Sequence, residues 1–408
     1  MELADFVKQH TDDDPFELSL HRDRWPDVDV ALAAECIRAR KKLRTKVPEW
    51  YADTGIICPS ALAAEQCSST LTARFKAGLV ADAKRIADLT GGLGIDTWQF
   101  ARNAEAVLYL EKNPVLVSAA RQNLARFACG AVSIKEGTVD AEVLPGLLDD
   151  FRPDVVYMDP ARRDVNGRKV FLPEDCSPDV LELQDIILGR GIRFLLKLSP
   201  MADISLMLRK FHCVKTVHAV QTDGECKELL LLLEPGFDGD PEIKAVVLDD
   251  SSSGIITFSY SGISAAKAVY IDRDPLPGQW LFEPGPALAK TGAFNLFSGS
   301  RNLPKLGPST HLFCFPHGED GKAFLSEYGR FGNCFTVNEV VPFGKAAIKD
   351  FASRWPDAEI SARGLRISSD ELKAKMKLRG GGDTHIFAVD TVAGKLLIAG
   401  TPVSPAPR

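Results

Sequence analysis

The chain has 408 residues, 45% of them hydrophobic and 25% charged, so we expect a globular protein of two or three domains. No apolar run approaches the roughly 20 residues of a membrane-spanning helix, and the acidic first residues lack the order of a signal peptide, so we expect a cytoplasmic location. The net charge of −6 does not indicate a nucleic-acid binder, and nine scattered cysteines without a Cys-x-x-Cys spacing argue against disulfide bonds and a metal site.

Residues 1–80 are predicted to form a helical region. Apolar residues recur at helical spacing over 31–46, where Pro48 follows, and a second helical stretch covers 61–80. The first stretch carries a basic cluster of Arg38, Arg40, Lys41, Lys42, Arg44 and Lys46. An exposed patch of this kind attracts polyanions, whereas paired with acids it is an ordinary helix face, and the sequence leaves both open.

Strand-like and helix-like runs alternate over residues 81–235. Strands are expected at 84–89, 105–111, 131–135, 153–158 and 192–198, and helices at about 95–103, 114–128, 139–150, 178–189 and 202–211. Two further strands, 214–221 and 227–234, enclose Asp223-Gly224 and predict an antiparallel hairpin. The alternation predicts an α/β fold with a mostly parallel, doubly wound sheet.

The composition shifts after residue 235 toward glycine, proline, serine and aromatic residues. Short strands and turns are expected over 236–335, with helical periodicity at about 286–297. The segment 336–408 is expected to contain a strand at 335–341, a helix at 345–354, a basic helix at 369–378 and a closing hairpin. A second basic cluster lies here, consisting of Arg363, Arg366, Lys373, Lys375, Lys377 and Arg379.

A glycine-rich turn follows the first strand of the α/β segment. Residues 88–97 read Asp-Leu-Thr-Gly-Gly-Leu-Gly-Ile-Asp-Thr, an acidic strand end followed by glycines and a helix, which is typical of a nucleotide-like cofactor site. A dinucleotide dehydrogenase would have a third glycine where Thr97 stands. Glu111, at the end of the second strand, can accept hydrogen bonds from ribose hydroxyls in a dehydrogenase or in a methyltransferase.

Three features favour the methyltransferase. Asp88 precedes the glycines, Asp159-Pro160 ends the fourth strand, and the sheet finishes in a hairpin. Together they resemble the class I S-adenosylmethionine-dependent methyltransferases over about residues 65–234. The resemblance implies a Rossmann-like seven-stranded sheet whose last strand is antiparallel, and S-adenosylmethionine as the cofactor.

Further motifs resemble one bacterial group within that class. They are residues 65–69 (Glu-Gln-Cys-Ser-Ser), 159–164 (Asp-Pro-Ala-Arg-Arg-Asp), 225–228 (Glu-Cys-Lys-Glu), 340–345 (Val-Val-Pro-Phe-Gly-Lys) and 375–383. The group is distantly similar to trimethylguanosine synthase and carries a ferredoxin-like and a C-terminal THUMP-like domain. The resemblance implies a helical region (1–80), a methyltransferase core (81–235), a ferredoxin-like domain (236–335) and a THUMP-like domain (336–408).

The resemblance also implies roles for the residues around the turn. Asp88, Thr90, Gly92, Gly94 and Asp96 would contact the methionine and ribose parts of the cofactor, and Glu111 would bind the ribose. Lys112 would line the adenine pocket, and Asp140 would contact the adenine amino group. Alternatively Thr138 caps the following helix, and Asp140 merely favours its first turn.

Asp159 and Pro160 stand where related enzymes have (Asp/Asn)-Pro-Pro-aromatic, a motif that holds a nucleophilic amine beside the methyl group. Here Ala161 replaces the second proline and Arg162 replaces the aromatic residue, which weakens the case for stacking on adenine. Arg162 and Arg163 could bind a base or a phosphate of the substrate, or they could pair with acids such as Asp164 and Glu228. We expect Asp159, Pro160 and Arg162 to be catalytic.

Strand ends elsewhere add candidate pocket residues. Lys197 and Ser199 end the fifth strand at the ligand-binding edge of such sheets, so we expect them to bind substrate, as we do Arg162 and Arg163. Ser69, Thr72 and Lys76 could contact the methionine carboxylate or belong to a capped helix, and Cys67 and Cys226 are expected in the core.

The sequence thus predicts a methyltransferase acting on nucleic acid, most plausibly RNA, with no membrane or metal partner. The alternatives are a small-molecule or protein methyltransferase and a non-catalytic RNA-binding protein that keeps the fold. The oligomeric state and the methylated atom stay open.

Overall fold

The computed structural model describes residues 3–127, 131–161, 178–250, 252–315 and 318–403. Residue contacts divide the chain into two compact units, which we describe separately. Unit 1 comprises residues 1–217, 228–239 and 248–250, and unit 2 comprises 218–227, 240–247 and 251–408. None of the helices in the described ranges is both long and apolar enough to cross a membrane.

Short helices form the first part of unit 1. They are α1 (Leu3–Gln9), α2 (Pro15–Leu20), the 3-10 helix η1 (Arg22–Arg24), α3 (Val30–Lys46), α4 (Pro48–Ala52), α5 (Ala61–Gln66) and α6 (Thr70–Leu79). The expected helix at 31–46 is confirmed, but the stretch 61–80 is two helices rather than one. The helix is interrupted because Ser69 caps α6 by accepting a hydrogen bond from the Thr72 N–H (3.2 Å).

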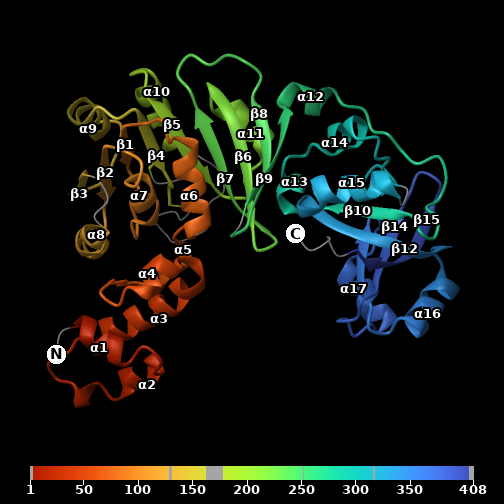
Figure 1. Cartoon of the computed structure of the whole chain (residues 1–408), viewed down its shortest axis with the longest axis horizontal. Helices are drawn as coiled ribbons and strands as arrows, with labels where there is room; N and C mark the ends of the chain where they lie inside the picture. Colours follow the sequence, from red (N-terminus) through yellow and green to blue (C-terminus); the bar gives the residue numbers. More distant parts are fainter. Residues whose placement is uncertain (1–2, 128–130, 162–177, 251, 316–317, 404–408) are drawn as a thin grey trace. The chain divides into compact units, whose positions relative to one another are not determined.

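The remainder of unit 1 alternates strands and helices, as expected. The strands are β1 (Arg85–Asp88), β2 (Ala106–Glu111), β3 (Ala131–Glu136), β4 (Val155–Met158), β5 (Arg193–Leu198), β6 (Val214–Thr222) and β7 (Glu225–Leu233), the last two reaching into unit 2. The helices are α7 (Ile95–Phe100), α8 (Pro114–Arg126), α9 (Val143–Phe151), α10 (Val180–Leu188) and α11 (Ile204–Lys210). Helices α7, α8 and α10 pack against β1, β2 and β5 (Figure 1).

The large sheet has the order β3-β2-β1-β4-β5-β7-β6-β8-β9. Strands β1 to β5 pair in parallel, and β7 lies antiparallel to β5, which confirms the predicted mostly parallel sheet with a reversed hairpin. The hairpin turn is built by Asp223 and Gly224, both at positive φ (52° and 74°). Strands β8 (Glu242–Leu248) and β9 (Ser253–Ser259) extend the sheet beyond the seven predicted strands.

The core of unit 1 joins the first helices to the sheet. Trp50 of α4 is fully buried, and its ring lies 5.6 Å from that of Phe127 and 5.9 Å from that of Trp98. The side-chain amide of Asn123 in α8 donates to the Ile57 carbonyl (2.7 Å) and accepts from the Ile57 N–H (2.9 Å). These contacts fix the segment that precedes the glycine turn.

Unit 2 is built on a second sheet with the order β11-β10-β12-β15-β14-β13. Its strands are β10 (Trp280–Pro284), β11 (Phe313–Phe315), β12 (Gly332–Pro342), β13 (Glu359–Arg363), β14 (His385–Asp390) and β15 (Lys395–Pro402). Its helical elements are α12 (Tyr260–Ala265), α13 (Pro286–Lys290), α14 (Phe294–Ser300), α15 (Glu319–Tyr328), the 3-10 helix η3 (Gly329–Phe331), α16 (Lys345–Arg354) and α17 (Ser369–Met376). The expected helices at 345–354 and 369–378 and the closing hairpin are confirmed.

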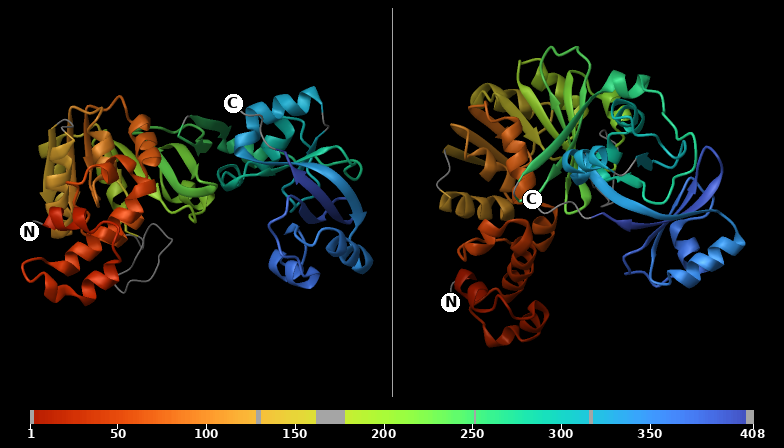
Figure 2. Two further views of the ribbon diagram at one scale, coloured as in Figure 1. Left: turned by 60° about the horizontal axis from the view of Figure 1, so that its bottom comes forward. Right: turned by 45° about the vertical axis from the view of Figure 1, so that its right-hand side comes forward.

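Alternation along β14 shows how this sheet is covered. Ile386 and Ala388 pack with α16 and α17 on one face, whereas Phe387 and Val389 belong to a cluster on the other face. In both views of Figure 2 the ribbons of α16 and α17, in blue, lie on the same side of this sheet. The helical periodicity at 286–297 proves to be two helices, because Gly292 adopts a positive φ (69°) between them. Helix α15 was not predicted.

Candidate active site

The turn between β1 and α7 requires its glycines. Gly92 and Gly94 adopt positive φ values (52° and 90°), a region that disfavours other residues. A Cβ atom on Gly91 would stand 2.2 Å from the ring of Tyr109, whose hydroxyl donates to the Gly92 carbonyl (2.7 Å). A Cβ on Gly92 would meet no neighbouring atom closer than 3.8 Å, so the positive φ rather than crowding requires glycine at this position.

Asp88 is held at the base of this turn. Its side chain is 1% exposed, and it accepts hydrogen bonds from the Thr90 N–H (3.1 Å) and the Thr97 hydroxyl (2.5 Å). Thr97 stands where a dinucleotide-binding fingerprint has its third glycine, and here its hydroxyl donates this hydrogen bond to Asp88. The sequence showed the replacement but not this hydrogen bond.

Burial, opposed by the Thr97 hydroxyl, raises the pKa of Asp88 to about 7. Because the folded state then holds the proton more tightly than the unfolded state does, the free energy of unfolding falls as pH rises from about 4 to about 7, and this contribution is constant above that range. Relative to an Asp88→Asn variant, the wild type should lose on the order of a few kcal/mol between about pH 5 and pH 8. Urea unfolding at both pH values measures this, and an unchanged difference contradicts it.

Glu111 brings a second carboxylate to the turn. One oxygen accepts from the Gly92 N–H (2.9 Å) and the other from the Asn113 N–H (2.8 Å). The side chain is half-buried at the end of β2, whereas Lys112 beside it is exposed. Glu111 therefore contacts the glycine turn from the end of β2, and its contact with a ribose stays a prediction.

Asp140 lies before α9, as expected, and its hydrogen bonds are local. One oxygen accepts from the N–H groups of Glu142 (3.0 Å) and Val143 (2.8 Å). Asp140, rather than Thr138, thus satisfies N–H groups at the start of α9. Its contact with an adenine amino group stays a prediction.

Asp159 is brought to the same turn by the backbone. Its N–H donates to the Thr90 hydroxyl (2.6 Å), so the loop after β4 is tied to the loop after β1. Its side chain is 28% exposed. Pro160 is buried beside it, and Arg162 and Arg163, to which we gave substrate roles, lie outside the described residues together with Asp164.

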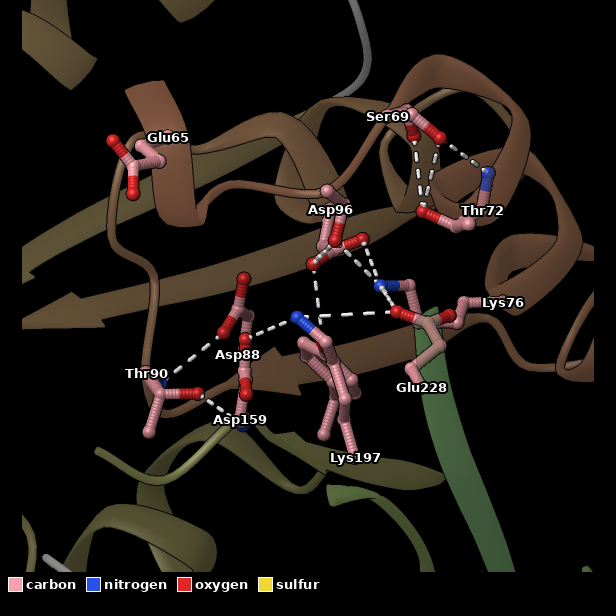
Figure 3. A network of polar contacts seen from close by, with 12 residues as sticks. Glu65, Ser69, Thr72, Lys76, Asp88, Thr90, Asp96, Asp159, Lys197 and Glu228 are labelled. Carbon is pink, nitrogen blue, oxygen red and sulfur yellow. Dashed lines mark hydrogen bonds and ion pairs between the residues drawn. The ribbon is translucent and has the colours of Figure 1, made fainter. Parts of the chain in front are cut away.

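A cluster of buried charges lies beside Asp159 (Figure 3). The Lys197 ammonium is 2.5 Å from Oδ2 of Asp159 and 3.9 Å from Oε2 of Glu228. The Lys76 ammonium is 3.3 Å from the same Glu228 oxygen and 2.9 Å from Oδ1 of Asp96. Asp96 is one of the residues that we expected near the cofactor.

The environment sets the charges within this cluster. Burial raises the pKa of Glu228, although both lysines oppose the shift. Burial also acts on Asp96, but Lys76 and Lys197 outweigh it and lower the pKa of that carboxyl. The pKa of Lys197 is raised despite burial because Asp159, Glu228 and Asp96 surround it, so Lys197 stays an ammonium ion.

Several side chains have positions that the sequence did not specify. Lys76 is fully buried in the charge cluster, and Ser69 caps α6. Glu228 is 2% exposed, whereas its neighbours Glu225 and Lys227 form an exposed ion pair at the hairpin tip (2.7 Å). Apolar flanking residues after Glu228 were the available signal that it faces the interior.

Two other expected residues have plain surroundings. Ser199 is 6% exposed and accepts from the Met201 N–H (3.2 Å). Burial raises the pKa of the Cys67 thiol, which donates to the Ala64 carbonyl (3.2 Å), in keeping with a core cysteine. Within the described ranges, no three histidine, cysteine or acidic side chains are grouped as metal ligands.

The side chains at the turn fit a cofactor that combines a ribose with positive charge. Asp88, Glu111 and Asp159 converge on one glycine turn. Carboxylates suit ribose hydroxyls, an ammonium group and a sulfonium group alike.

Two domain-family models and a named relative match this chain. Residues 280–318 match a ferredoxin-like domain model and residues 332–402 match a THUMP domain-like model. In two strains of Mycobacterium tuberculosis, a protein named as an uncharacterized S-adenosylmethionine-dependent methyltransferase is 24% identical over 361 residues, which cover 88% of this chain and 91% of that protein.

A solved structure matches nearly the whole chain. It is the crystal structure of a candidate methyltransferase from Porphyromonas gingivalis, with 29% identity, a TM-score of 0.86 and 98% coverage of both chains. The chain therefore has the fold of the S-adenosylmethionine-dependent methyltransferases, followed by ferredoxin-like and THUMP-like segments.

Proposed function

We propose that this protein transfers the methyl group of S-adenosylmethionine to RNA. The observation that carries the proposal is the convergence of Asp88, Glu111 and Asp159 on one glycine turn, in a chain that matches a candidate methyltransferase over 98% of its length. The protein is an S-adenosylmethionine-dependent methyltransferase by its fold and by the names of its relatives. RNA as the methyl acceptor is what we add.

The residues of the turn would hold the cofactor. Asp88 and Gly92 would contact its methionine part, and Glu111 would bind its ribose hydroxyls. When bound, S-adenosylmethionine supplies an activated methyl group attached to a sulfonium sulfur.

Asp159 would receive the nucleophile. Its carboxylate is partly exposed, and its backbone is fixed to Thr90, so it can accept a hydrogen bond from an N–H of the acceptor base. Holding the nucleophile in line with the methyl group is the main contribution that a protein makes to a displacement of this kind. The amine nucleophile is implied by the resemblance to the Asp-Pro-Pro-aromatic motif.

Several of the six side chains in the first basic cluster are engaged within the protein. Arg38 pairs with Glu35, Lys42 pairs with Glu65, and Arg40 is buried against the Tyr51 and Asp53 carbonyls. Arg44 of this cluster is exposed, so the contacts make α3 a weaker candidate for RNA binding than the second cluster.

The second basic cluster, in unit 2, supports RNA binding. Lys373 pairs with Glu359 and Arg379 with Asp357, but among the described residues no partner is recorded for the side chains of Arg366, Lys375 and Lys377. All three are exposed, and they lie in the segment that matches the THUMP domain-like model. Exposed cations without counter-charges are suited to phosphate contacts.

Reversing two of these charges should weaken RNA binding. In Lys375→Glu/Lys377→Glu, we expect the affinity for total RNA to fall by at least about tenfold at low salt, and the slope of log Kd against log salt to become shallower by about two. Filter binding over a salt series measures both. Lys322→Glu, in the same unit, is the control because Lys322 is paired with Glu319, and equal losses in control and double variant would contradict the assignment.

Incubation with methyl-labelled S-adenosylmethionine and total cell extract tests the proposal directly. Label that enters RNA and is removed by ribonuclease supports it. Label that enters only protein or small molecules favours those substrates, and cofactor binding absent from calorimetry favours a non-catalytic RNA-binding protein. The likeness to trimethylguanosine synthase, the four-domain division and a cytoplasmic location stay predictions.

A further inference from the structure

The surroundings of Lys197 differ from those expected of a lysine that binds substrate. It ends β5, is 5% exposed, and its ammonium donates to Oδ2 of Asp159 at 2.5 Å. A protonated lysine has three donors and no lone pair, so Lys197 cannot accept a proton from the nucleophile. The ammonium already lies between the carboxylates of Asp159 and Glu228, which disfavours the binding of an anionic substrate group there.

The Lys197 ammonium is in turn held in place by Glu228. Glu228 on β7 lies 3.9 Å from Lys197 and 3.3 Å from Lys76. The Lys76 ammonium, on α6, also forms an ion pair with Asp96 (2.9 Å) and donates a hydrogen bond to the hydroxyl of Ser68 (2.6 Å). We call this alternating series, which runs Asp159, Lys197, Glu228, Lys76 and Asp96, the charge ladder (Figure 3).

The charge ladder connects the loop after β4, which carries Asp159, to four other elements. Its members come from β5, β7, α6 and α7 as well as from the loop after β4. Asp159 is fixed twice, by its N–H to Thr90 and by its Oδ2 to Lys197. Its remaining carboxylate oxygen, Oδ1, is the one that can receive a substrate hydrogen bond.

We infer that Lys197 is a positioning residue, which holds the Asp159 carboxylate in the one orientation that presents Oδ1 to the nucleophile, and that Glu228 keeps Lys197 in place. The inference rests on the proposed function because it assigns the receiving group to Asp159. It predicts that losing Lys197 lowers the turnover number and spares substrate binding. A lysine that contacted RNA directly would instead change KM.

Lys197→Met is the first test. We expect kcat to fall by about 100-fold, as for a misplaced catalytic group, with the KM for RNA and the Kd for S-adenosylmethionine within about threefold of wild type. Lys197→Arg, which keeps the charge and the donors, should recover at least about tenfold of the loss. Unchanged kcat in Lys197→Met, or a loss confined to KM, overturns the inference.

Lys197→Met removes one of the two cations that neutralise the buried Glu228 charge, and a loss of folding would also lower kcat. A second variant controls for that effect. Lys197→Met/Glu228→Gln removes one charge of each sign, and we expect it to bind S-adenosylmethionine while keeping the low kcat. Glu228→Gln alone should lower kcat less, and its effect should shrink in the Lys197→Met background, since Glu228 acts through Lys197. Additive effects of the two substitutions contradict this order of action.

Lys215→Met is the matched control. Lys215 lies on the neighbouring β6 and pairs with Glu234 (2.5 Å), but it is exposed and outside the ladder, so kcat should not change. All rates are measured on whichever acceptor the wild type methylates. Wild-type transfer to RNA thus tests the proposed function, whereas the ratio of variant to wild-type kcat tests Lys197.

Discussion

Asp159→Ala should lower kcat by about 100- to 1,000-fold while leaving the Kd for S-adenosylmethionine within about threefold. The reason is geometric: the Asp159 side chain is 28% exposed, more than the other two carboxylates of the charge ladder, and its backbone contact with Thr90 survives the substitution. Asp159→Asn should be milder, because the amide keeps one oxygen acceptor for the substrate N–H, although it loses the charge that engages Lys197.

Single-turnover kinetics and calorimetry separate the two quantities. Asp154→Ala is the matched control, since Asp154 precedes the same strand and binds the N–H groups of Lys84 and Arg85 (both 2.8 Å) at the opposite end. Normal turnover in Asp159→Ala, or an equal loss in Asp154→Ala, would remove Asp159 from the site.

Lys76→Met should be the most destabilising single change in the charge ladder. Lys76 is fully buried between Asp96 and Glu228, so its loss leaves two buried carboxylates with one fewer cation. Breaking a buried ion pair from one side costs about 3–5 kcal/mol in the free energy of unfolding, because the remaining charge is uncompensated.

Urea unfolding with and without S-adenosylmethionine measures the effect. Lys84→Met provides the comparison: Lys84 also makes an ion pair, with Glu105 at 2.9 Å, but both side chains are about 70% exposed, and little change is expected. If the two variants lost the same free energy of unfolding, the buried ion pairs of the charge ladder would contribute no more to stability than an exposed pair does.

Much of unit 1 was predictable because its strands and helices have different periods. The runs at 84–89, 105–111 and 192–198 are apolar and lie between helical segments, so both their type and their parallel pairing follow from the pattern. Helix α15 was not predicted, because Phe324, Leu325 and Tyr328 give it only a short apolar face. It is stabilised by packing against the aromatic core of unit 2, which local sequence does not reveal.

The candidate site was predictable only in part, for a similar reason. Asp88, Glu111 and Asp159 each end a strand, so the parallel sheet places them together at one edge. The contacts of Lys76 and Glu228 depend on how α6 and β7 pack, and these residues are 152 positions apart in the chain. The sequence singled out Lys76 and the motif that contains Glu228 separately, but no local pattern shows that these two side chains form a pair.

The most direct test of the central claim is nucleoside mass spectrometry of RNA from cells with and without the gene. We expect one methylated nucleoside to be lost on deletion, to return with the wild-type gene, and to stay absent with the Asp159→Ala variant. An RNA nucleoside profile that deletion leaves unchanged, together with label transfer to RNA that is indistinguishable between wild type and Asp159→Ala, would contradict the claim.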